Sequence, residues 1–73
     1  MAVHEGLAVE SPRLEALIRH QIGWQIDALE VLVEDHGLIL RGHANCAFAR
    51  ARVAEAAERL AGMPVLANEI TVN

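Results

Sequence analysis

The 73-residue sequence lacks features that several classes of protein require. Cys46 is its one cysteine, so no disulfide can form within the chain, and a zinc ribbon or a CxxC redox motif is excluded. All six basic residues are arginines, and ten carboxylates leave a net charge of −4, which gives no long-range attraction for polyanions. The aromatic residues are limited to one tryptophan and one phenylalanine, too few for a base-stacking surface. We therefore expect no nucleic acid partner.

Long apolar runs are also missing. None approaches the length of about 20 residues that spans a bilayer, and residues 1–10 carry two glutamates without the basic start of a secretory signal. As written, the chain is expected in the cytoplasm, and as a piece of a longer protein it would fit an envelope-associated location. An apolar fraction of 53% argues against disorder. A chain this short builds one core and buries only about 60% of its unfolded surface, which leaves room for self-association.

Two segments have the pattern of amphipathic helices. Ser11-Pro12 is a typical helix start and Gly23 a plausible end, and Asn45 and Gly62 bound the second segment in the same way. The polar positions of the first segment, predicted to face water, are Arg13, Glu15, Arg19 and His20. The apolar positions, predicted to face the core, are Leu14, Leu17, Ile18 and Ile22 in the first helix and Ala49, Val53, Ala56, Ala57 and Leu60 in the second.

Three segments alternate as strands do, over residues 29–34, 38–44 and 66–72. Asp35-His36-Gly37 provides turn chemistry between the first two, and Gly42 indicates a bulge or a close approach by a helix. The order is α-β-β-α-β, and a helical connection makes the last two strands parallel. We predict an α+β fold, a small three-stranded mixed sheet with two helices packed on one face, as a single domain over residues 11–73 after a flexible tail over residues 1–10.

The stretch from Leu29 to Asn73 resembles a BON domain, a family named for bacterial osmotic-stress and nodulation proteins. The resemblance is carried by Asp35-x-Gly37, by Leu40-x-Gly42, by the alanine-rich helix with Arg50 and Arg52, and by the ending from Gly62 to Val72 with its Asn-x-Ile-x-Val. The segment from Leu14 to Trp24 fits as the first helix. The resemblance implies a module that attaches, without catalysis, to phospholipid membranes, to envelope components or to other domains of the same protein, often in exported or envelope proteins and sometimes in tandem or fused to other modules.

No catalytic or metal site is expected, and no cofactor. His43-x-x-Cys46 with His36 has the ligand types that zinc prefers, but its spacing is mixed, so a solvated histidine and a small packed cysteine explain it better. A cysteine nucleophile would need a base and an orienting carboxylate or amide, and only His43 stands near.

Two functions remain open, membrane attachment and protein interaction. For the first, Arg41, Arg50 and Arg52 would hold phosphate head groups and Trp24 would enter the lipid interface. For the second, which includes self-association as a homo-oligomer, a partner would pair with the edge of the third strand or cover the open sheet face, where Leu32, Ile39 and Thr71 are expected. Trp24 could instead close the bottom of the core, and we favour this burial because a core so poor in aromatic residues would gain from it.

Overall fold

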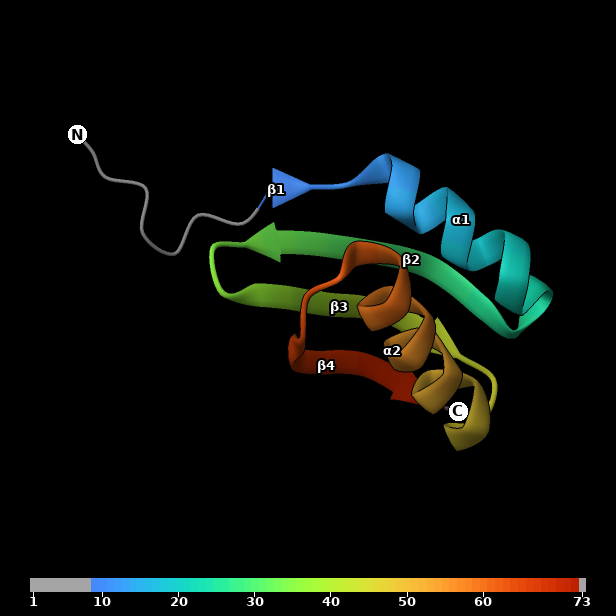
Figure 1. The fold of residues 1–73 in the computed structure, drawn as a ribbon. Coiled ribbons are helices and arrows are strands. Elements are labelled where there is room, and N and C mark those ends of the chain that lie inside the picture. The colour runs from blue at the N-terminus through green and yellow to red at the C-terminus, as the bar shows by residue number, and fades with distance from the viewer. Residues whose placement is uncertain (1–8, 73) are drawn as a thin grey trace.

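The computed structural model describes residues 9–72 and has the predicted α+β architecture (Figure 1). Its elements are β1 (Val9–Glu10), α1 (Pro12–Ile22), a single 3₁₀ turn η1 (Gly23–Gln25), β2 (Ile26–Glu34), β3 (Gly37–Ala44), α2 (Ala47–Ala61) and β4 (Val65–Val72). The sheet order is β1-β2-β3-β4, with β2 and β3 antiparallel and β3 and β4 parallel. Both helices pack on one face of the three long strands, so the order α-β-β-α-β is confirmed.

The short strand β1 is an addition that the sequence did not predict. Val9 and Glu10 pair antiparallel with Val33 and Leu32 of β2, and the Ser11 amide then donates to the Val31 carbonyl at 2.9 Å. The last two residues of the predicted tail over residues 1–10 therefore form β1. The rest of this tail, residues 1–8, lies outside the described residues.

Helix α1 begins and ends where the sequence predicts, but its buried side differs. The Ser11 hydroxyl accepts from the Leu14 amide, and Gly23, at φ 75°, donates its amide to the Arg19 carbonyl. Two predictions about its sides are wrong, because Glu15 is buried and Leu17 is 45% exposed. The carboxylate of Glu15 turns inward because it accepts the amide of Val31 at 3.0 Å, a strand donor that would otherwise be buried without a partner.

Helix α2 presents its small residues to the sheet, as predicted. Ala49, Val53, Ala56 and Ala57 are buried, and Gly62 ends the helix in the left-handed conformation. The prediction of an Asn45 cap is wrong. Cys46 holds the cap position without a side-chain hydrogen bond, and the backbone amide of Asn45 donates to the Gln25 carbonyl at 3.0 Å.

The core is aliphatic and lies between the helices and the sheet. The alternation of β2 and β3 is confirmed. Of the two explanations predicted for Gly42, a bulge or a close approach by a helix, the structure shows the bulge. A side chain at Gly42 would meet the backbone of Asp27 and Leu29 at 3.1 Å, so the glycine accommodates the bulge in β2 and not a helix. The fully buried core side chains of greatest volume are Ile18, Leu38, Leu40, Val31 and Val53.

Candidate functional site

Both aromatic side chains of the protein are exposed. Trp24, in η1, is 81% exposed, and Phe48, in the first turn of α2, is 66% exposed. The prediction that Trp24 closes the core is therefore wrong. The bottom of the core is filled by Ile22 and Ile26, which flank η1 and are 6% and 4% exposed, and the turn between them directs the indole into solvent.

The turn η1, which holds Trp24, and the first turn of α2, which holds Phe48, lie at the same end of the domain, on the right in Figure 1. Ile26 at the start of β2 pairs with Ala44 at the end of β3, and Ala44 pairs with Val72, which is 39% exposed. The hydrogen bond from Asn45 to Gln25 joins η1 to the chain that enters α2. We call Trp24, Phe48, Arg52 and Val72 the aromatic end.

Arg52 adds a cation to this end. Its guanidinium carbon lies 5.8 Å from the centroid of the Phe48 ring, one helical turn away, which is within cation–π distance. Arg52 and Trp24 were predicted from the sequence as site residues, but Phe48 and Val72 were not. The signal for Phe48 was present, since it stands outside the apolar stripe of α2 and four residues before an arginine.

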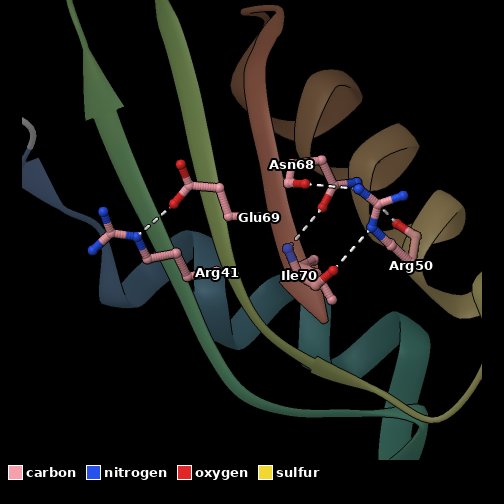
Figure 2. A network of polar contacts seen from close by, with 5 residues as sticks. All are labelled: Arg41, Arg50, Asn68, Glu69 and Ile70. Carbon is pink, nitrogen blue, oxygen red and sulfur yellow. Dashed lines mark hydrogen bonds and ion pairs between the residues drawn. The ribbon is translucent and has the colours of Figure 1, made fainter. Parts of the chain in front are cut away.

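Arg50, the next predicted head-group ligand, is occupied within the fold (Figure 2). Its Nε donates to the Ile70 carbonyl at 2.9 Å and its Nη2 to the Asn68 carbonyl at 2.8 Å. The Asn68 side chain completes the network. Its amide donates to the Arg50 carbonyl at 3.4 Å and its oxygen accepts the Ile70 amide at 3.3 Å. The guanidinium thus fastens the start of α2 to β4 through two of its five N–H donors.

Arg41 lies on the other side of β4, on the sheet face opposite the helices (Figure 2). Its Nε donates to Glu69 at 2.9 Å, and both side chains are about half exposed. This hydrogen bond and the charge of Glu69 raise the pKa of Arg41, with a smaller contribution from Glu30. The cation is therefore matched by carboxylates across the sheet, and it does not join Trp24 or Arg52 in one site.

The three residues predicted for the open sheet face do lie on it, but Thr71 lies apart from the other two. Leu32 and Ile39 are half-buried and pair directly across β2 and β3. Thr71 lies at the other end of the face, where its hydroxyl donates to the Gly42 carbonyl and lies 2.8 Å from Nδ1 of His43. The charged row that contains Arg41 separates the two, so these residues do not form one apolar patch.

Charge is divided between the two layers of the fold. The two helices carry five arginines and three carboxylates, a net charge of +2. The strands and the hairpin turn carry one arginine and six carboxylates, a net charge of −5. The negative charge of the chain thus resides mainly in the sheet layer, and the side of the domain that holds Arg52 is basic.

The residue groups weighed for chemistry are not assembled. His36 lies in the turn before β3 and Cys46 follows the far end of that eight-residue strand, so they lie at opposite ends of the domain. Within residues 9–72, no three or more metal-ligating side chains gather. Neither helix of this part of the chain is long and apolar enough to cross a membrane.

Comparison with known proteins adds no relative. No protein-family model matches the chain, and no curated protein or solved structure does. The candidate site therefore rests on the residues and their geometry.

Proposed function

We propose that this domain is a non-catalytic module that attaches to phospholipid membranes through its aromatic end. The observation that carries the proposal is that the only two aromatic side chains of the chain are both exposed at one end of a domain whose core is aliphatic. Tryptophan combines a large apolar body with a polar N–H, which suits the boundary between lipid tails and head groups. Val72, which is 39% exposed at the end of β4, adds a further apolar side chain at this end.

The electrostatics favour Arg52 as the head-group ligand in place of Arg41 and Arg50. Arg50 is committed to β4 and Arg41 to Glu69, whereas Arg52 is exposed at the aromatic end. An arginine near an anionic surface contributes about 1 kcal/mol. The net charge of −4 overstates the electrostatic repulsion between the helix side of the domain and an anionic membrane, because most carboxylates lie in the sheet layer.

The size of the aromatic end predicts weak and reversible attachment. Trp24 and Phe48 together present roughly 300 Å² of apolar surface, worth about 8 kcal/mol if all of it left water. The loss of translational and rotational freedom on binding consumes much of this gain. Stable anchoring would therefore need a second signal, such as a neighbouring module on the same chain or several copies acting together.

The test is a titration of Trp24 fluorescence with vesicles of zwitterionic lipid alone and of zwitterionic lipid mixed with anionic lipid. We expect emission typical of exposed indole in buffer and a blue shift that is larger with anionic vesicles. In a flotation assay, Trp24→Ala and Phe48→Ala should each reduce binding at least fivefold, and Arg52→Ala should remove the preference for anionic lipid. Leu66→Ala is the matched control, since Leu66 is 51% exposed but lies near the opposite end of β4.

Protein interaction is the second candidate, and one observation favours it. Tryptophan and arginine are among the residues most enriched at the energetic centres of protein interfaces, and both lie at the aromatic end. The vesicle titration separates the two functions. An indole spectrum that stays unchanged with both kinds of vesicle would reject membrane attachment and leave this end as a surface for a protein.

A further inference from the structure

Strand β4 forms one edge of the sheet, and the backbone of such a strand is usually open to pairing with another chain. Here four of its backbone groups are already occupied by side chains of the same domain, namely the Val65 amide, which donates to Glu58 at the start of the strand, and three groups at its centre. Arg50 donates to the carbonyls of Asn68 and Ile70, and the Asn68 side chain accepts the Ile70 amide (Figure 2). In a parallel strand, alternate residues direct their amide and carbonyl to the same side. The backbone N–H and C=O groups of Asn68 and Ile70 therefore point away from β3, toward the outer edge of the sheet.

We propose that the outer edge of β4 is a latent pairing surface for a second copy of this chain, held closed by the side chains of Arg50 and Asn68. This inference is independent of membrane attachment. The two side chains satisfy the groups that a new strand would use, so the edge is covered at its centre, away from the register irregularity between Val65 and Ala67 at its start.

A second copy fits this edge because β4 is self-complementary about Glu69. In an antiparallel pair centred there, Asn68 of one copy faces Ile70 of the other and exchanges with it the hydrogen bonds that Arg50 and Asn68 now supply. The same register places Leu66 opposite Val72, which are 51% and 39% exposed in the single domain, so each would cover the other. Two-fold pairing of this kind closes on itself and gives a dimer.

One feature of the same register opposes the pair. Glu69 of each copy would face Glu69 of the other on the open side of the sheet, and like charges directly opposite are destabilising. The ion pair with Arg41 at 2.9 Å reduces this repulsion without removing it. The closed edge and the facing carboxylates together favour the monomer in the native sequence.

The test is sedimentation equilibrium of Arg50→Ala over a wide range of protein concentration. We expect dimerisation at least tenfold tighter than that of the native chain, together with slower hydrogen exchange of the Ile70 amide in the dimer. Arg52→Ala is the matched control for self-association, since it removes the same charge two residues away without touching β4, and its sedimentation should match that of the native chain. Circular dichroism establishes that each variant is folded.

A second substitution tests whether the dimer contact lies at the outer edge of β4. Leu66→Asp placed in the Arg50→Ala background should restore the monomer, because it sets a charge against Val72 of the other copy. If Arg50→Ala is folded and remains as monomeric as Arg52→Ala at every concentration, the edge is not a latent surface and the proposal fails. A dimer that persists with Leu66→Asp would also overturn it, because the contact would then lie elsewhere. If Arg50→Ala does not fold, Asn68→Ala, which frees only the Ile70 amide, is tested by the same criteria.

Discussion

The buried carboxylate of Glu15 provides the sharpest test of the energetics of the fold. Glu15 leaves water to accept the Val31 amide at 3.0 Å, on the side of β2 where β1 has ended and α1 has begun. Removing the acceptor leaves a buried amide without a partner, which costs about 1–3 kcal/mol. The whole domain has a stability of roughly 4–11 kcal/mol at the usual 0.05–0.15 kcal/mol per residue. We therefore expect Glu15→Ala to lose a large share of it.

Thermal and urea unfolding would measure this loss. For a domain of this size each kcal/mol shifts Tm by about 4–8 °C, so Glu15→Ala should lower Tm by roughly 5–20 °C. Glu15→Gln keeps an oxygen acceptor in nearly the same place and should recover at least half of the loss. Glu55→Ala removes an exposed carboxylate of α2 and should stay within about 0.5 kcal/mol of the native chain. If Glu15→Ala were as stable as Glu55→Ala, the bond to Val31 would have no part in stability.

Another prediction concerns backbone packing at the start of β3. Gly37→Ala should destabilise the domain by about 1–3 kcal/mol, because the added methyl would press on the Pro64 carbonyl and lie 2.7 Å from Cγ of Leu66. Gly62→Ala is a useful comparison, since its methyl meets nothing within 4 Å and its cost of about 1–2 kcal/mol arises only from the left-handed φ of 69°. A crystal structure or NMR shifts should show movement of the loop before β4 in Gly37→Ala alone. An undisturbed loop would contradict the packing argument.

The fold was predictable because its signals are local and agree with one another. Ser11 and Gly23 bound one helix, two alternating segments flank a turn, and the helical connection makes β4 parallel to β3. The sides of α1 were predicted less well. Periodicity alone cannot distinguish Leu17 from Glu15, because the choice depends on the Val31 amide that the tertiary fold brings to one of them.

The candidate site was predictable in part, and the predictions that failed have a common cause. Trp24 was assigned to the core from the gain that burial would bring, but that gain requires room, and Ile22 and Ile26 fill it. Arg50 was assigned to a ligand because arginines suit phosphate, but two strand carbonyls lie within its reach. In both cases the residue type indicates what a side chain can do. The neighbours of the side chain in the folded domain decide which of these interactions it makes, and sequence spacing does not specify those neighbours.

The two proposals constrain each other through the direction of β4. The aromatic end lies at the carboxyl end of this strand, so an antiparallel pair of β4 strands places the two aromatic ends at opposite ends of the dimer. Such a dimer cannot lie with both ends on one flat bilayer, and it can instead join two. We therefore expect Arg50→Ala to cluster anionic vesicles, measured as a rise in turbidity, whereas the native chain binds them without clustering.

Adding Trp24→Ala to Arg50→Ala should leave the dimer intact and abolish the clustering of vesicles, because the dimer contact and the membrane contact use different residues. A dimer that binds vesicles as tightly as the native chain without clustering them would contradict the antiparallel arrangement, since a parallel pair alone would set both aromatic ends on the same bilayer. On this geometry, the hydrogen bonds of Arg50 do more than fasten α2 to β4. In the proposed arrangement they also close the outer edge of β4, so that a single aromatic end would meet a single surface.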